Sequence, residues 1–444
     1  MGDKTSDWKE ELGRFLKPFL ARLGHKARRQ MCPLYVSGLI GPGDRKSIQP
    51  MAERLALGEY DQLHHFIADG VWDAAPVETE LLVQADRLVG GSDAVLVVDD
   101  TAIPKKGTHS VGVAPQYCSA LGKTANCQTL VSLTLARGEV PVMLALRLFL
   151  PESWTSKRAR LERAGVPTEY RTGRTKLEMA LAEIDRIIAA GVRFGCVLAD
   201  AGYGMSAPFR QGLTARKLAW AVGIPRHLKV YPADVQMIRP VTPRGRPRQR
   251  IPDTLSVAAQ DMLATAKWQN ISWRTGTKGK LRARFAAVRV RVADGSPQRI
   301  KDKTYQHVPG EQAWLIGEHR ASGEKKYYLA NLPAKTDLRT LAATIKARWV
   351  CEQAHQQLKE ELGLDHFEGR SWQGLHRHAL MTMIAYAFLQ YRRLATAGRK
   401  KKNRRPAAPA NSARRTSRHS RALGSTTPTA MSTLPKMDMQ RAAA

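Results

Sequence analysis

The chain has 444 residues, of which 43% are hydrophobic and 7% aromatic, so it is long enough for two or three domains and too apolar to be disordered throughout. No uninterrupted apolar run reaches the length of a membrane span. Its 71 Lys and Arg residues against 39 Asp and Glu residues give a formal net charge of +32, and the natural partner of such a surface is a polyanion, nucleic acid before an anionic membrane.

The cysteines and the N-terminus indicate a cytoplasmic protein. The five cysteines include no close C-x-x-C pair, which argues against a disulfide framework and against a zinc finger, so we expect reduced thiols. The first 20 residues mix acids and bases in a helical pattern and contain no apolar signal segment. Together with the basic charge, this predicts a cytoplasmic, nucleoid-associated protein.

Residues 1–92 are predicted to form a helical N-terminal domain that binds DNA. Apolar residues recur at intervals of three and four in "DWKEELGRFLKPFLARL" and "VETELLVQADRLV", which is the pattern of amphipathic helices. The basic stretch "HKARRQ" at residues 25–30 fits either a phosphate contact or a solvated helix face, and the solvated face is favoured.

Residues 93–223 are predicted to form the first part of an α/β core. "AVLVVD", "FGCVLAD" and "AWAVGI" are typical of buried strands, and "QTLVSLTLARGEVPVMLALRLFLP" predicts two strands joined at Arg137 and Gly138. "KLEMALAEIDRIIAAGV" predicts an amphipathic helix, and "APFRQGLTARKL" a second one. This order of strands and helices is that of a mixed α/β sheet.

The rest of the chain is predicted as a β-rich basic insertion at 224–335, the C-terminal helices of the core at 336–393 and a disordered basic tail at 394–444. The core helices comprise one long helix from Thr336 to Gly363 and a buried final helix. Trp268, Trp273 and Trp314 in the insertion fit core packing or stacking on an unpaired base, and core packing is favoured.

Aspartates come directly after two of the predicted buried strands. Asp99 and Asp100 end one strand and Asp200 ends another, so all three are expected near the crevice where open α/β sheets place their chemistry. Neighbouring carboxylates repel unless a divalent cation neutralises them, which suits magnesium or manganese and two-metal cleavage of a phosphodiester. For either position alone, an ordinary turn or helix-cap role remains the commoner alternative.

A third acid lies on the long predicted helix. Arg348, Glu352 and Lys359 are spaced i, i+4 and i+11, which places them within about 40° of one another on one helical stripe. An ordinary ion-paired solvent face has the same spacing, and on spacing alone it is the favoured interpretation. The histidines His355, His366, His376 and His378 do not have a zinc-site arrangement, and surface or DNA-contact roles are favoured for them.

The combination of motifs resembles a known family. "VVDDT" followed by "PKKGTHSVGVAPQYCSALGKTANCQ", then "VLADAGYG", then "RWVCEQAHQQLKEELGLDHFEGRSW" are similar to stretches of bacterial insertion-sequence transposases. These belong to the DDE superfamily with an RNase H-like catalytic core, in the branch related to the insertion-sequence-four group and to insertion sequence seven hundred and one. The resemblance covers roughly Arg45 to Leu394, and "KKGTHSVGV" and "GLDHFEGRSW" make it specific.

The resemblance implies a catalytic triad that also binds metal. Asp99 matches the first acid, with Asp100 as the alternative, Asp200 matches the second and Glu352 the third. The family's Tyr-x2-Arg-x3-Glu-x6-Lys signature maps onto Arg348, Glu352 and Lys359, whereas its tyrosine position holds Ile345. The implied fold is an RNase H-like mixed sheet flanked by helices, with the helical N-terminal domain and the β-rich insertion.

The implied function is DNA transposition. The enzyme would bind the terminal inverted repeats of its element, cleave the DNA ends with two Mg²⁺ or Mn²⁺ ions and join them to target DNA, acting as a homodimer in the synaptic complex. Arg348 and Lys359 would contact DNA phosphates, with Lys105, Lys106 and Lys123 as weaker candidates. The alternatives are a metal-dependent nuclease of the same core that does not join strands, and a catalytically inert DNA-binding derivative.

Overall fold

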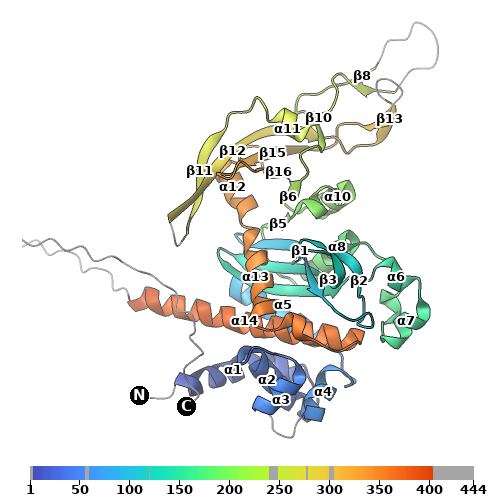
Figure 1. Cartoon of the computed structure of the whole chain (residues 1–444). Helices are drawn as coiled ribbons and strands as arrows, with labels where there is room; N and C mark the ends of the chain where they lie inside the picture. Colours follow the sequence, from blue (N-terminus) through green and yellow to red (C-terminus); the bar gives the residue numbers. More distant parts are fainter. Residues whose placement is uncertain are drawn as a thin grey trace, which may run out of the picture.

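The computed structural model describes residues 4–55, 60–119, 121–239, 249–276, 279–299 and 305–403 (Figure 1). The segments predicted as helices before residue 92 are helical. These helices are α1 (Lys4–Ala21), α2 (Lys26–Ile40), α3 (Ile48–Leu55), α4 (Tyr60–Ile67) and α5 (Ala75–Val89). In Figure 1 the blue helices α1 to α4 lie on one side of the long helix α14, which has the sheet on its other side. The N-terminal helices therefore reach the sheet partly through α14.

The core of the described chain is one 12-stranded mixed sheet, as the predicted α/β class requires. Its strands are β1 (Val95–Pro104), β2 (Ala114–Cys118), β3 (Lys123–Arg137), β4 (Val140–Leu148), β5 (Cys196–Ala199), β6 (Trp220–Ile224), β7 (Lys229–Pro232), β10 (Val257–Ala258), β11 (Gln269–Gly276), β12 (Gly279–Val292), β15 (Gln312–His319) and β16 (Lys325–Ala330). They run in the order β10-β7-β12-β15-β16-β6-β5-β1-β3-β2, with β11 beside β12 and β4 beside β3. Two small hairpins stand apart, β8 (Met237–Ile238) with β9 (Ile251–Pro252) and β13 (Pro297–Arg299) with β14 (Tyr305–His307).

Strands from the basic segment 224–335 continue the sheet of the core. β16 pairs antiparallel with β6, and Leu329 lies opposite Val222. The tight turn between β15 and β16 contains Gly323, whose φ of 86° favours glycine. Backbone hydrogen bonds thus link the segment 224–335 to β6, which in turn pairs with β5, the strand directly before Asp200.

The three tryptophans of this segment pack against other protein groups, which is the role favoured from the sequence. Trp273 stands edge-on to Phe285 with ring centroids 5.7 Å apart, and Trp268 lies edge-on to His319 at 6.1 Å. The indole nitrogen of Trp314 donates to the carbonyl of Pro333 over 3.0 Å. All three rings are half-buried against protein groups.

The remaining helices and 3₁₀ turns flank the sheet or connect its strands. They are α6 (Glu152–Thr155), α7 (Arg158–Arg163), η1 (Thr168–Tyr170), α8 (Lys176–Ala189), α9 (Ala201–Gly204), α10 (Ala207–Ala215), α11 (Ala259–Met262), α12 (Leu338–Lys346), α13 (Trp349–Glu360), η3 (Leu364–His366) and α14 (Trp372–Asn403). Nowhere in the described ranges is a helix both long enough and apolar enough to cross a membrane.

Strand β1 has helices on both of its faces. Leu96 and Val98 belong to the same apolar cluster as Ile184 of α8, whereas Val97 belongs to the cluster that contains Ile345 of α12. Because successive side chains of a strand point to opposite faces, the residues that follow must also divide between α8 and the α12–α13 side. This alternation decides which of the two adjacent aspartates meets which helix.

The prediction of a single helix from Thr336 to Gly363 is wrong, because the structure has two helices there, α12 and α13. At the junction, the amides of Val350 and Cys351 donate to carbonyls three residues back, at Ala347 and Arg348, so the backbone tightens instead of continuing the α-helical ladder. No glycine or proline marks the break. Arg348 is the residue at the N-terminal boundary of α13.

The final helix is longer than predicted. α14 continues to Asn403, so the first residues of the tail predicted to be disordered from residue 394 are helical. Its central turns are buried on all sides, as the apolar pattern indicates. Residues 404–444 of the predicted tail lie outside the described residues.

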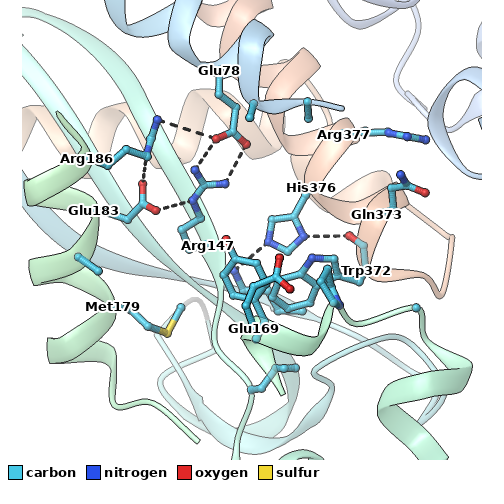
Figure 2. A pocket seen from close by; sticks show the side chains of 18 of the residues that line it. Glu78, Arg147, Glu169, Met179, Glu183, Arg186, Trp372, Gln373, His376 and Arg377 are labelled. Carbon is cyan, nitrogen blue, oxygen red and sulfur yellow. Dashed lines mark hydrogen bonds and ion pairs between the residues drawn. The ribbon is translucent and has the colours of Figure 1, made fainter. Parts of the chain in front are cut away.

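A buried ionic cluster joins three elements, as Figure 2 shows. Arg147 of β4 donates from Nη1 to Glu78 of α5 over 2.8 Å and from Nε to Glu183 of α8 over 2.8 Å, and its Nη2 binds the second oxygen of Glu78. Arg186 donates to the other oxygen of Glu183 over 2.8 Å. The side chains of Arg147 and both glutamates are 17% exposed or less. We call this set the Arg147 cluster, and it ties the N-terminal helix α5 to the sheet.

Removing the centre of the cluster is expected to destabilise the protein strongly. Arg147→Met leaves Glu78 and Glu183 without their shared partner, and losing one member of a buried pair costs about 3–5 kcal/mol of folding free energy. Urea unfolding followed by circular dichroism measures the change in midpoint. Arg158→Met is the matched control, because its pair with Glu162 is exposed, and its midpoint should stay near that of the wild type. Equal midpoints for the two variants would contradict the structural role of Arg147.

The cluster also predicts an acid-dependent loss of stability. Burial raises the pKa of Glu78, but Arg147 outweighs burial, so the pKa of this carboxyl lies below its ordinary value of 4.5. A depressed folded-state pKa stabilises the protein above the unfolded-state pKa, and this gain is lost as pH falls through the folded-state value. The difference in unfolding midpoint between wild type and Glu78→Gln should therefore be largest above pH 4.5 and shrink on acidification, and a pH-independent difference would refute the assignment.

Candidate active site

Two aspartates lie side by side next to the end of β5: Asp200 directly follows this strand, whereas Asp99 lies within β1, which continues to Pro104 instead of ending at the acids as the sequence predicts. The pairing runs from Val95 opposite Cys196 to Val98 opposite Ala199, so the next residues, Asp99 and Asp200, follow in adjacent strands. Burial raises the pKa of Asp200, and the nearby charge of Asp99 raises it further. The two carboxylates are therefore close enough to repel each other.

Asp200 also has a local structural role. Its carboxylate accepts a hydrogen bond of 3.2 Å from the amide of Tyr203 and so caps the short helix α9. The turn or cap role that the sequence left as the alternative is thus present here, alongside the approach to Asp99.

Asp99 is held on the face of the sheet that carries α12 and α13. Its Oδ2 accepts from Arg348 Nη1 at 2.5 Å and from the thiol of Cys351 at 3.2 Å, and its Oδ1 accepts from the amide of Asp100 at 2.8 Å. The side chain is 15% exposed. Sequence reasoning did not single out Cys351, although it directly precedes Glu352.

Glu352 joins this group through one guanidinium. Arg348 uses Nη1 for Asp99 and Nη2 for Glu352, so it bridges two carboxylates that are 253 positions apart in the chain. Glu352 is 61% exposed, whereas Arg348 is 24% exposed. Burial lowers the pKa of Arg348, but the carboxylates led by Asp99 outweigh burial and raise it, so the guanidinium stays charged.

The donor set fits a hard divalent cation in its chemistry. Asp99, Asp200 and Glu352 offer carboxylate oxygens only, the ligand type that magnesium and manganese prefer. A cation, the guanidinium of Arg348, already lies between two of the three. Over the described residues, no three Asp, Glu, His or Cys side chains converge as ligands of one ion.

Asp100 points to the opposite face, as the alternation along β1 requires. Its carboxylate accepts from Lys176 Nζ of α8 at 2.6 Å and from the hydroxyl of Tyr203 at 2.5 Å. Burial raises the pKa of Tyr203, and so does the charge of Asp100, so the phenol stays protonated and can donate. Both oxygens of Asp100 are therefore used to hold α8 and α9 against the sheet.

A buried polar chain supports the backbone at Asp99. Ser132 lies opposite Asp99 in β3 and donates to its carbonyl over 3.0 Å, and His355 Nε2 of α13 lies 2.8 Å from the Ser132 hydroxyl. Burial, assisted by Lys359 and Arg348, lowers the pKa of His355 to about 3, so the ring is neutral. The surface or DNA-contact role expected for His355 is wrong, because the side chain is buried.

The surface or DNA-contact role expected for His378 is also wrong. The ring is 1% exposed, its Nδ1 lies 2.8 Å from the hydroxyl of Tyr35 and its Nε2 lies 3.0 Å from the carbonyl of Gly363. It therefore links α2, α14 and the start of the "GLDHFEGRSW" stretch, and it has no accessible surface for DNA.

The remaining predicted residues have different surroundings. Lys105 Nζ donates to the carbonyls of Asp365 and Phe367, at 3.4 and 2.7 Å, and so fixes the "GLDHFEGRSW" stretch. Lys359 is half-buried, and burial lowers its pKa. Lys106 and Lys123 are exposed. Ile345, at the tyrosine position of the signature, is buried in the apolar cluster beneath α12.

The family of the chain follows from comparison with known proteins. The model of the DDE superfamily endonucleases matches residues 18–280, more than half of the chain, so the chain belongs to this family. The matched range includes Asp99 and Asp200 and ends before Glu352.

Individual relatives are more distant. The probable transposase for insertion sequence element IS701 from Microchaete diplosiphon is 30% identical over 169 residues, which is 38% of this chain and 41% of that protein. The match thus spans less than half of the relative's length. Among solved structures, the piggyBac transposase synaptic complex with hairpin DNA aligns at 10% identity with a TM-score of 0.38, covering 83% of this chain and 66% of that chain.

The contacts of Asp100 predict a measurable stability effect. Tyr203→Phe removes one donor from a half-buried carboxylate, and a hydrogen bond to a charged group contributes about 1–3 kcal/mol. Thermal unfolding should show a lower midpoint for this variant. Tyr170→Phe serves as the control, since that ring is 41% exposed, and its midpoint should not change. A wild-type midpoint for Tyr203→Phe would rule out a stabilising bond between Tyr203 and Asp100.

Proposed function

We propose that this DDE superfamily endonuclease is a DNA transposase. It would bind the terminal inverted repeats of its insertion sequence, cleave the DNA ends and join them to target DNA at a site formed by Asp99, Asp200 and Glu352. The observation that carries the proposal is the adjacency of Asp99, within β1, and Asp200, directly after β5, with Arg348 connecting Asp99 to Glu352. The relative named as a probable transposase supports the same function.

The three carboxylates would hold two divalent ions, Mg²⁺ or Mn²⁺. When bound, such ions lower the pKa of an attacking water or 3′-hydroxyl and stabilise the leaving 3′-oxygen. Asp99 lies within β1 and Asp200 directly follows β5, whereas Glu352 comes from the first turn of α13 and is exposed, so it can turn toward them. No covalent intermediate with the protein is needed, because water in the cleavage step and the freed 3′-hydroxyl in the joining step would attack phosphorus directly while the 3′-oxygen leaves.

DNA is the partner that the charge of the chain favours. The formal net charge is +32, and phosphate contacts by Lys and Arg supply most of the sequence-independent affinity of DNA-binding proteins. Arg348 and Lys359 on α13 would contact phosphates at the cut, and the exposed Lys106 and Lys123 would extend this contact. Lys105 is a weaker candidate, because its ammonium is engaged by two carbonyls. We infer a homodimer that bridges two DNA ends.

The carboxylates give the decisive variants. Asp99→Asn and Asp200→Asn should lower Mg²⁺-dependent cleavage of a labelled duplex carrying the element's terminal repeat by about a thousandfold, because each removes several kcal/mol of metal-assisted stabilisation. Gel-shift binding of the same duplex should persist. Asp100→Asn is the matched control at the neighbouring position, and it should retain cleavage at a temperature where it is folded. Full activity of Asp200→Asn, or loss confined to Asp100→Asn, would disprove the site.

A second assay separates a transposase from its rivals. Cleaved ends with free 3′-hydroxyls are incubated with a supercoiled target and the wild-type protein, and joined products are expected only with Mg²⁺ or Mn²⁺. Cleavage without any joined product would indicate a nuclease of the same core. Binding without cleavage would indicate an inert DNA-binding derivative.

A further inference from the structure

One cation serves two of the three carboxylates in the candidate site. Arg348 reaches Asp99 at 2.5 Å with one nitrogen and Glu352 with the other. The hydrogen bonds that lower the pKa of Asp200 come from backbone amides, and the charge of Arg348 lowers this pKa without a hydrogen bond between the two side chains. The guanidinium is therefore the positive charge that lets Asp99 and Glu352 lie together beside Asp200.

We propose that Arg348 is an internal counter-ion that holds the place of a divalent cation until one binds. This inference rests on the proposed function, since it assigns the order in which the cation and DNA bind at that same site. A cation that binds Asp99 and Glu352 must displace the guanidinium from their oxygens. The displaced Arg348 is then free to bind a DNA phosphate, which offers the same bidentate geometry as a carboxylate.

The two contacts of Arg348 differ in strength. Its pair with Glu352 joins a residue that is 61% exposed, and exposed i,i+4 pairs contribute only a few tenths of a kcal/mol. Its pair with Asp99 is more buried, with 15% of that side chain exposed, and water screens it less. The Glu352 contact should therefore open first, and an ion with twice the charge then competes for Asp99.

The place of Arg348 in the backbone suits this exchange. It lies at the junction of α12 and α13, where the helical hydrogen-bond ladder is interrupted. Glu352 lies one helical turn after Arg348, so a change in the rotamer of Arg348 separates the two side chains without unfolding α13. Cys351, whose thiol also donates to Asp99, stays in place and keeps the aspartate oriented.

Coupling between metal and DNA follows from this arrangement. If an ion frees Arg348 for a phosphate, DNA binding must in turn favour the ion, because the coupling free energy between two ligands is reciprocal. The protein without DNA should then bind divalent ions weakly, and the protein–DNA complex should bind them more tightly. This limits metal loading to the protein that holds its substrate.

The test measures Mn²⁺ affinity rather than activity. In the full-length protein without DNA, Arg348→Gln should bind Mn²⁺ about fivefold or more tightly than the wild type by isothermal titration calorimetry, because the competing cation is gone. DNA should increase Mn²⁺ affinity in the wild type and have little effect in the variant. Arg339→Gln is the matched control on α12, since Arg339 is exposed and donates to the Ser272 carbonyl, and it should behave as the wild type.

The outcomes separate this inference from the proposed function. Unchanged or weaker Mn²⁺ binding by folded Arg348→Gln overturns the counter-ion role. Arg348→Lys, which retains the charge but cannot bridge both acids, should show intermediate affinity and covers the case in which Arg348→Gln does not fold; wild-type affinity in Arg348→Lys also overturns the inference. Loss of Mn²⁺ binding in Asp200→Asn and Glu352→Gln is expected, and its retention in both would reject the metal site itself.

Discussion

The repulsion between the carboxylates of Asp99 and Asp200 on two neighbouring parallel strands is the constraint on which the candidate site depends. Asp99 and Asp200 lie in adjacent strands because β1 and β5 are in register up to Val98 and Ala199. Burial and mutual repulsion raise the free energy of the doubly charged state, and the raised pKa of Asp200 reflects it. A nearby cation reduces this repulsion, and the fold brings Arg348 from a region distant in sequence to supply one.

The alternation of side chains along β1 gives two adjacent acids different tasks. The side chain of Asp99 lies on the same face of β1 as that of Val97 and binds Arg348 and Cys351. The side chain of Asp100 lies on the opposite face, with that of Val98, and binds Lys176 and Tyr203. A shift of one residue in the register would exchange these surroundings. The motif "VVDDT" therefore combines a position in the candidate site with a structural one, and the structural acid holds α8, which precedes Asp200, and α9, which follows it.

Much of the fold could be predicted from local pattern, but the site only in part. The periodicity of residues 176–189 and the apolar runs before Asp99 and Asp200 predict the helix α8 and the strands β1 and β5, since these signals are local. The break between α12 and α13 has no local signal, since neither glycine nor proline lies there, and the contacts that hold the two helices join residues far apart in the chain. The run "VLVVDD" is apolar at every position before the acids, so it could not reveal which aspartate faces α13; the register and the flanking helices decide that.

The interruption at Arg348 separates contacts to two halves of one sheet. On the α12 side, Lys346 binds the buried Glu318 of β15 over 2.8 Å and Arg339 donates to Ser272 of β11. On the α13 side, Cys351 and His355 are bound to Asp99 and to Ser132 of β3. A straight helix would fix the orientation of both sets of contacts at once, whereas the tightened turn lets each helix follow its own strands. Arg348 thus lies between the contacts to the two halves of the sheet and itself binds the carboxylates of Asp99 and Glu352.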